Sequence, residues 1–455
     1  MTELNSARYF GIAGLYITGT WFLSSAAIYN RFPLIYPDSG SYLQAFIEWH
    51  NLPERPIFYS IFIGLLHWRL SLWPIVIGQS ILTIFVIERT LTHLVPRVGL
   101  VAKLTVVAIL TLATSLPWFA GQIMADLFAP VMVLALYLTV VERHHLANWE
   151  YYTLLLILCV AQASHYTHVS IALGLLACLA VAALVFGAPK LRSLLPVALT
   201  STVAILAIMT VNFTARSEVV FAPYGSVFLL DRLIAYGTAQ DYLTQHCPSL
   251  HYSICEYLDE IKQQPREASW LLWHDDSILP KMGGAEHHKR EADRLVRAVV
   301  LDAPGKHIGL VLGATIRQFF NFGTGLELPR LGEGMQIYRI VMTYFPSEAE
   351  AYIHSRQYLG QLNLGLINRI DIPVAYASLF ALTWLLGLGI AKHDVALIIF
   401  CSVIFLALLG NAILCGGLSA GEARYQSRVM SLVPLAAAVG FLRMRVHSKM
   451  AMDSG

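Results

Sequence analysis

Stretches of roughly 20 apolar residues recur along the chain, and they constrain the fold more than any other feature. Each stretch is long enough to cross a hydrocarbon core about 30 Å thick as a helix. Of the 455 residues, 56% are hydrophobic and only 13% are charged, whereas roughly 25% are charged in a soluble domain. The sequence therefore predicts an all-α polytopic membrane protein that has the bilayer as its solvent.

Lys and Arg in the short loops predict the orientation, because these residues gather on the cytoplasmic side. The apolar runs predict about ten crossings of a bacterial inner (plasma) membrane, with both termini in the cytoplasm. The first run is read as an uncleaved anchor, since it exceeds the 7 to 15 residues of a usual signal core. Two shorter segments, 57–67 and 308–322, are predicted to be interfacial or re-entrant. The expected spans begin near Tyr9, Leu72, Leu104, Leu127, Tyr151, Val169, Leu194, Ile372, Val395 and Arg428.

Three segments follow from this pattern. Residues 1–213 form an N-terminal membrane module, 214–371 a periplasmic region with interfacial helices, and 372–455 a C-terminal membrane module. The middle segment contains Cys247 and Cys255, which can close a small disulfide loop in an oxidising compartment. Two free thiols remain the alternative, because spacing alone does not define pairing.

Charge and motifs exclude several classes of function. The formal net charge is only +2, without a Lys/Arg run or an aromatic-basic stripe, so no nucleic-acid partner is expected. The sequence has no Gly-rich phosphate loop, nucleophile elbow or zinc-binding His-Glu motif. No cofactor is predicted, although a divalent ion at two carboxylates remains an alternative.

The most informative stretch is Pro37-Asp38-Ser39-Gly40-Ser41, which directly follows the first apolar run. A carboxylate at a membrane boundary is costly unless it has a partner or a task, so Asp38 is a candidate catalytic residue. The same residues suit the cap of a following helix, which is the alternative interpretation. The stretch Arg55-Pro56-Ile57-Phe58-Tyr59 follows shortly afterwards.

In this arrangement the chain resembles the GT-C superfamily of membrane glycosyltransferases, in particular the branch of protein mannosyltransferases and the lipid A aminoarabinose transferase. These families place an acidic residue after the first span, then an Arg-Pro or Pro-Pro and a tyrosine, which Asp38, Arg55 and Tyr59 match. A second acid at the fourth span matches Asp126. An Arg-Tyr pair before the last spans matches 424–425. The resemblance implies a GT-C-like helical bundle with its active site on the periplasmic face.

The resemblance also implies the reaction: transfer of a sugar from a polyprenyl-phosphate donor to a hydroxyl of a glycan, lipid or protein. Asp38 would be the general base, and Asp126 would orient a sugar hydroxyl or help bind an ion. Arginine suits the departing phosphate, because its planar fork binds phosphate oxygens in pairs. The predicted substrate-binding residues are Asp126, Arg55, Tyr59, His165, His168, Arg424, Tyr425 and Arg428.

Each of these residues also has a structural interpretation. Asp126 fits a helix cap, His165 and His168 fit a polar rim, and Arg428 fits a headgroup anchor. Two other functions remain open: a transporter or flippase for a lipid-linked intermediate, and a transferase of the O-antigen polymerase or ligase kind. A transporter would place its charges near the bilayer midplane, whereas here they gather on one face.

Overall fold

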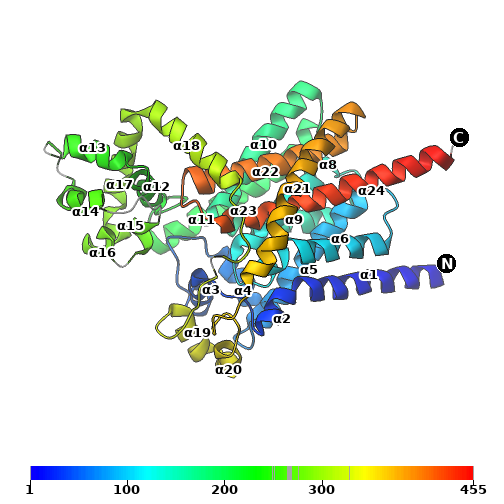
Figure 1. The fold of residues 1–455 in the computed structure, drawn as a ribbon, viewed down its shortest axis with the longest axis horizontal. Coiled ribbons are helices and arrows are strands. Elements are labelled where there is room, and N and C mark those ends of the chain that lie inside the picture. The colour runs from blue at the N-terminus through cyan, green and yellow to red at the C-terminus, as the bar shows by residue number, and fades with distance from the viewer. Residues whose placement is uncertain are drawn as a thin grey trace. The chain divides into compact units, whose positions relative to one another are not determined.

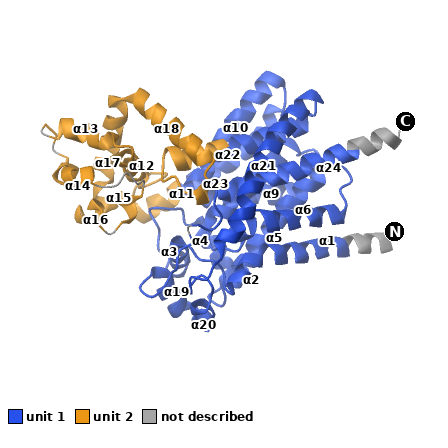
Figure 2. Ribbon diagram, in the orientation of Figure 1, with its two compact units in different colours: residues 1–208, 322–408, 427–455 blue, residues 209–321, 409–426 orange. Residues whose placement is uncertain are grey.

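The computed structural model describes residues 2–247, 249–250, 252–263, 269–274, 276–326 and 328–453. These residues form helices and loops, with a single isolated bridge between Leu34 and Gln122 in place of any sheet (Figure 1). They divide into two compact units (Figure 2). Unit 1 comprises 1–208, 322–408 and 427–455, and unit 2 comprises 209–321 and 409–426.

Unit 1 is a bundle built around one wholly apolar helix, α8 (Phe128–Val141), in which every residue from Phe128 to Val140 is buried. A helix that is apolar on all sides must be covered on all sides; α5 and α9 pack against it. The other helices of unit 1 are α1 (Thr2–Leu23), α2 (Ser25–Asn30), α3 (Pro37–Ile47), α4 (Phe58–His67), α5 (Trp73–Leu94), α6 (Leu100–Ala113), α7 (Leu116–Ala120), α9 (Asn148–Ala163), α10 (Tyr166–Phe186), α19 (Gln336–Tyr344), α20 (Ala349–Ile353), α21 (Leu364–Ala391) and α24 (Leu432–Asp453).

Three helices cross the boundary between the units: α11 (Leu195–Arg216), α22 (Val395–Ala412) and α23 (Ala423–Met430). Unit 2 has its own apolar core, and the disulfide between Cys247 and Cys255, with Cα atoms 5.6 Å apart, lies at its edge. Its helices are α12 (Gly225–Ala235), α13 (Thr238–His246), α14 (Leu258–Gln263), α15 (Trp270–Trp273), α16 (Ile278–Lys281), α17 (Ala285–Asp302) and α18 (Pro304–Phe319).

This division differs from the three segments expected from the sequence. Residues 322–371 group with unit 1 rather than with the rest of 214–371, and residues 409–426 group with unit 2. The reason is packing: α19 contacts α3, and α21 contacts α24. Hydropathy alone does not show these contacts.

Within the part of the chain that the structure describes, six helical segments are long and apolar enough to cross a membrane: Trp73–Leu94, Tyr166–Phe186, Leu191–Arg216, Leu364–Ala391, Val395–Gly417 and Ala423–Val446. Four further apolar helices are shorter, at Phe10–Leu23, Phe58–His67, Leu100–Ala113 and Ala125–Val141. The structure thus supports an all-α membrane protein but not the full count of about ten spans. At 1.5 Å per residue, a helix of 14 residues is only about 21 Å long.

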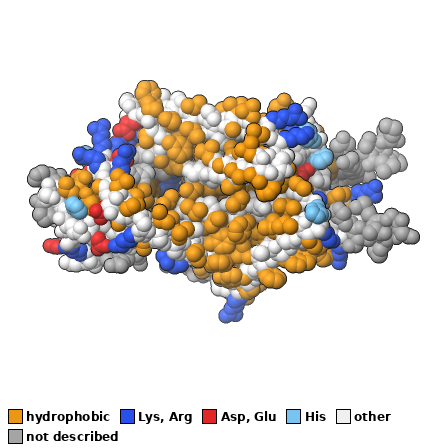
Figure 3. Space-filling model, turned by 90° about the horizontal axis from the view of Figure 1, so that it is seen from above, with side chains coloured by type: hydrophobic (Ala, Val, Ile, Leu, Met, Phe, Trp, Pro, Cys, Tyr) orange, Lys and Arg blue, Asp and Glu red, His pale blue; other side chains and the backbone are white. Residues whose placement is uncertain are grey.

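Apolar side chains cover the outside of unit 1. Helices α10 and α21 expose large hydrophobic residues such as Leu184, Phe380 and Trp384, as expected of surfaces that face lipid. Figure 3 shows a broad hydrophobic surface, with Lys, Arg and His toward its left-hand edge and again toward its right-hand edge. In Figure 1, α1 and α24 both extend to the right-hand side.

Two loops of unit 1 are joined by backbone hydrogen bonds. The N–H of Leu34 donates to Gly121 O over 2.9 Å, and the N–H of Ile123 donates to Leu34 O over 3.0 Å. The Ser39 hydroxyl, in the first turn of α3, donates to Ile123 O over 2.7 Å. These bonds bring the loop before Asp38 against the loop before Asp126.

Candidate functional site

Asp38 lies in the first turn of α3, behind Pro37 at the first helical position. Proline is favoured there because it has no N–H to leave unsatisfied, and an acid in the first turn is favoured by the helix dipole. The Asp38 carboxylate contacts the Arg55 guanidinium at 2.8 Å, with the two side chains 28% and 10% exposed. Asp38 therefore presents a charged, partly open carboxylate at a fixed position.

Aromatic rings form one wall beside this pair. The Arg55 guanidinium carbon lies 5.2 Å from the ring centre of Tyr42, and the Tyr42 and Tyr59 rings meet edge to face at 4.8 Å. The Tyr59 hydroxyl donates to Gln79 Oε1 over 2.7 Å. Burial alone would lower the pKa of Arg55, but the charge of Asp38 raises it above its usual value, so the guanidinium stays charged.

Asp126 and Arg428 form a second ion pair, which is buried. Their side chains are 2% and 0% exposed, and the Arg428 Nη1 to Asp126 Oδ1 distance is 2.7 Å. Arg428 Nη2 also donates to the Thr167 hydroxyl over 3.3 Å. Since a buried charge needs a partner of opposite sign, each residue keeps the other ionised. Arg428 is packed inside the bundle and is not open to a phosphate from outside.

Thr167, which contacts Arg428, also contacts His165, and the His165 ring lies beside that of His168. The N–H of Thr167 donates to His165 Nδ1 over 3.2 Å, so the proton of the His165 ring is on Nε2. The His168 Nδ1 lies 2.9 Å from Ala161 O and donates to it, which leaves Nε2 of His168 as an acceptor. The pKa of His165 is lowered well below its usual value, first by burial and then by the neighbouring His168 and Arg428.

The two ion pairs belong to one site in unit 1. The Tyr166 hydroxyl lies 3.5 Å from Pro53 O, in the loop that carries Arg55. The charges of Asp126, Arg428 and Arg55 all act on the pKa of His165. The structure thus brings together the predicted residues Asp38, Asp126, Arg55, Tyr59, His165, His168 and Arg428.

Arg424 and Tyr425 belong to unit 2. The Arg424 guanidinium carbon lies 4.7 Å from the centre of the Tyr425 ring, and Arg424 Nη2 is 3.6 Å from Glu422 Oε2. Both residues lie in the first turn of α23, which begins at Ala423, five residues before the start expected from the sequence.

Sequence reasoning missed Gln79 and Thr167. Gln79 is fully buried in α5 and donates through Nε2 to Ala120 O and Gln122 O over 3.0 and 2.9 Å. An amide inside an otherwise apolar span is a signal that could have found it, because such a group needs partners. Thr167 carried no such signal, since threonine is ordinary at a helix start.

The site has the chemistry of a polar ligand site with two acids, and each acid contacts an arginine. Among the described residues, no group of three His, Cys, Asp or Glu side chains is arranged to hold a metal ion. A partly open carboxylate can accept a proton, and neutral His165 can donate one hydrogen bond through Nε2. Comparison with protein-family models, with curated proteins and with solved structures finds no match to this chain.

Proposed function

We propose that this protein is a membrane glycosyltransferase that moves a sugar from a polyprenyl-phosphate donor to a hydroxyl acceptor, with its site on the periplasmic side of the inner membrane. The observation that carries the proposal is the Asp38 carboxylate, which is partly open and held at 2.8 Å by the mostly buried Arg55. A base at the boundary between bundle and water suits a reaction between a lipid-borne sugar and a polar acceptor.

In the proposed reaction, Asp38 accepts the proton of the acceptor hydroxyl as its oxygen attacks the anomeric carbon. The bond from that carbon to the phosphate oxygen breaks, and polyprenyl phosphate leaves with the electron pair. A positioned carboxylate contributes about 10²- to 10⁴-fold to such a step. Arg55 keeps Asp38 in place and offers its charge to the departing phosphate.

The buried pair behind Asp38 has a different role in this proposal. Asp126 and Arg428 hold α23 against the loop before α8, and Arg428 positions Thr167 and through it His165. His165 Nε2–H is then a donor for a sugar hydroxyl or a phosphate oxygen. Tyr42 and Tyr59 are 1% and 0% exposed, and they pack beside Arg55, which they help to position.

The orientation rests on the distribution of basic residues. Arg97 lies in the turn between α5 and α6, and Lys103 lies in the first turn of α6; such residues near the ends of spans favour the cytoplasmic side. This basic turn follows the end of α5. Near the start of α5, Gln79 contacts the loop before Asp126, and that loop contacts the first turn of α3, which carries Asp38. This arrangement supports a site on the periplasmic side.

The test compares the wild type with Asp38→Asn in lipid nanodiscs, using a panel of radiolabelled polyprenyl-phosphate sugars and measuring hydrolysis or transfer. The control is Asp394→Asn, because Asp394 also contacts an arginine, Arg443, at 2.8 Å and is 21% exposed. We expect Asp38→Asn to lose about 10²- to 10⁴-fold in rate and the control to retain it. A wild type inactive on every donor would favour a transporter or flippase, and an Asp38→Asn variant as active as the wild type would reject Asp38 as the general base.

A further inference from the structure

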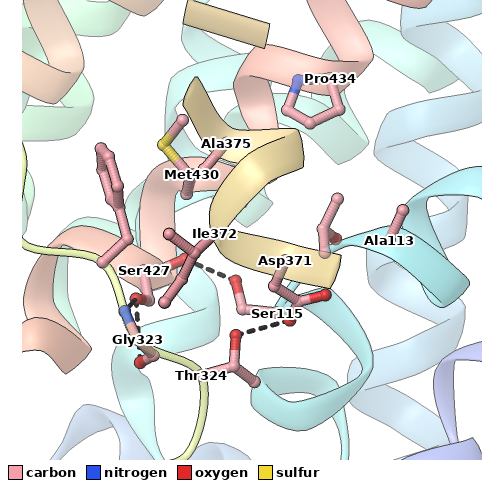
Figure 4. Close-up of a pocket in the computed structure, with 12 residues that line it drawn as sticks. Ala113, Ser115, Gly323, Thr324, Asp371, Ile372, Ala375, Ser427, Met430 and Pro434 are labelled. Carbon is pink, nitrogen blue, oxygen red and sulfur yellow. Dashed lines mark hydrogen bonds between the residues drawn. The ribbon is translucent and has the colours of Figure 1, made fainter. Parts of the chain in front are cut away.

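A small pocket of unit 1 lies apart from the side chains of the proposed site (Figure 4). The pocket is lined by the break between α6 and α7, by the non-helical segment 322–324 and by the N-terminal part of α21. Its volume is about 20 Å³, enough for one water molecule or one small ion. Its polar lining residues are Thr114, Ser115, Gly323, Thr324, Asp371 and Ser427.

Asp371 is the charged group of this pocket. It is only 8% exposed and belongs to α21, an apolar helix of 28 residues that is long enough to cross a membrane. The Thr324 hydroxyl donates to its Oδ2 over 2.6 Å. Within the described part of the chain, Oδ1 has no hydrogen-bond donor, and the residues that line the pocket include no Lys, Arg or His. A buried carboxylate without a counter-charge is costly.

Hydroxyl groups line the pocket together with this carboxylate, those of Thr114, Ser115, Thr324 and Ser427. Asn368, one turn earlier on α21, pairs with the backbone of Thr324 at both N–H and C=O, over 2.7 and 2.9 Å, and so holds the Thr324 hydroxyl beside Asp371. On the other side, the pocket is lined by Ala113, Thr114 and Ser115, where α6 ends before Pro117 of α7. Irregular backbone in a membrane bundle is tolerated where it lines a cavity.

The donor set defines the class of ligand. Hard cations take carboxylate, hydroxyl and carbonyl oxygens, and one carboxylate balances one positive charge. A divalent or transition metal would need more acids or histidines, and the described residues hold no cluster of three. A phosphate would be repelled, and a sugar ring exceeds the volume.

We propose that this pocket binds a single sodium ion, held by the Asp371 carboxylate, the Thr324 hydroxyl and the hydroxyl of Ser115 at the break between α6 and α7. This inference goes beyond the proposed glycosyl transfer and does not depend on it. The bound ion supplies the positive charge that the Asp371 carboxylate lacks. It also joins three parts of unit 1 that are distant in sequence.

The ion site is connected to the segment that carries Arg428. The Ser115 hydroxyl donates to Ser427 O over 2.7 Å, and the Ser427 hydroxyl exchanges hydrogen bonds with the backbone of Gly323, over 2.9 and 3.1 Å. Ser427 directly precedes Arg428 in the chain. Sodium binding therefore stabilises the local backbone from which Arg428 reaches Asp126.

The experiment measures binding of radioactive sodium to the full-length protein in nanodiscs of phosphatidylethanolamine and phosphatidylglycerol, with choline chloride holding the ionic strength constant. We expect saturable binding of one ion per chain for the wild type. Asp371→Asn should abolish it, and Thr324→Val should weaken it at least tenfold. Asp394→Asn, an acid exchanged at a distant ion pair, should bind like the wild type.

Sodium should also raise the midpoint of thermal unfolding of the wild type, because a ligand that binds only the folded state stabilises it. No saturable binding by the wild type overturns the proposal, as does wild-type affinity in a folded Asp371→Asn. If Asp371→Asn does not fold, Thr324→Val and Ser115→Ala decide: unchanged sodium affinity in both rejects the site. Neither readout requires a glycosyl donor, so the outcome is separate from that of the transferase test.

Discussion

Asp38–Arg55 and Asp394–Arg443 are two ion pairs of unit 1 with the same shortest distance, 2.8 Å, but they differ in what else their atoms do. Arg443 contacts both oxygens of Asp394 and also donates to Leu94 O, while Asp394 accepts from the N–H of Leu397. This pair ties together α5, α22 and α24.

Asp38 and Arg55 have no such additional bonds. Within the described residues their contact is a single one, and it is flanked by the Tyr42 ring instead of by backbone groups. The Asp38 carboxylate keeps acceptor capacity for a ligand, whereas that of Asp394 is used up within the fold. Equal distance therefore does not mean equal role; the remaining hydrogen-bonding capacity separates a candidate site from a structural tie.

The Asp126–Arg428 pair is more deeply buried than the other two pairs. Its disruption should therefore change the free energy of unfolding the most. Arg428→Met leaves the Asp126 carboxylate buried without its partner, so we expect a loss of about 3–5 kcal/mol in the free energy of unfolding. Denaturation in detergent measures it. The double variant Asp126→Asn/Arg428→Met should recover part of the loss. A single variant as stable as wild type would contradict the pairing.

A second prediction distinguishes the two partly exposed pairs, Asp38–Arg55 and Asp394–Arg443. Arg55→Gln should reduce sugar transfer about 100-fold, since it removes the group that holds the base and faces the phosphate, while changing unfolding by less than about 1 kcal/mol. Arg443→Gln should show the opposite pattern: sugar transfer is retained, and the free energy of unfolding falls by about 2 kcal/mol. The comparison fails if both variants lose activity and stability together.

A fourth carboxylate, Asp231 in unit 2, shows how a buried acid behaves when no arginine forms an ion pair with it. Burial raises its pKa to about 7 from 3.8, although the N–H of Leu271 and the charge of Arg232 act to lower it. Between these values the folded state keeps a proton that the unfolded state has lost. Stability should therefore fall as pH rises from about 4 to about 7, at most by about 1.4 kcal/mol per pH unit.

The variant Asp231→Asn should remove most of this dependence, because its side chain stays neutral and still accepts from the N–H of Leu271. Thermal unfolding of the two proteins at about pH 4, 5, 6 and 7 measures the difference between their pH dependences of stability. The same slope in both proteins would show that another group titrates.

The smallest effect is expected for Asp394→Asn. Asparagine is a good helix cap and its oxygen can still accept from the N–H of Leu397, so only the charge is lost. We expect a change below about 1 kcal/mol, as for other partly exposed pairs, and a weaker dependence of unfolding on salt than in wild type. A loss of more than about 3 kcal/mol in the free energy of unfolding would mean that this pair behaves like the buried pair Asp126–Arg428.

The sequence by itself determined the class of fold. Runs of apolar residues with few charges predict helices in a bilayer, and the observed helices follow most of those runs because hydropathy and length are local properties. The stretches around Asp38, Arg55 and Asp126 stood out for the same reason, since each is a charge beside an apolar run. The sequence did not show that α6 ends before Thr114–Pro117 or that α8 is short. Both regions look like full membrane spans, because residue composition does not show where a helix ends.

Only the tertiary structure decided which of these residues meet. The partners Arg55 for Asp38 and Arg428 for Asp126 are separated from them by 17 and 302 positions in the chain, and such pairings depend on packing between helices. The same holds for Asp371, which the sequence presents as the edge of a span and which the fold places in a pocket with Thr324 and Ser115. A charge is visible in the sequence, but its partner, its burial and the oxygen atoms around it exist only after the helices pack.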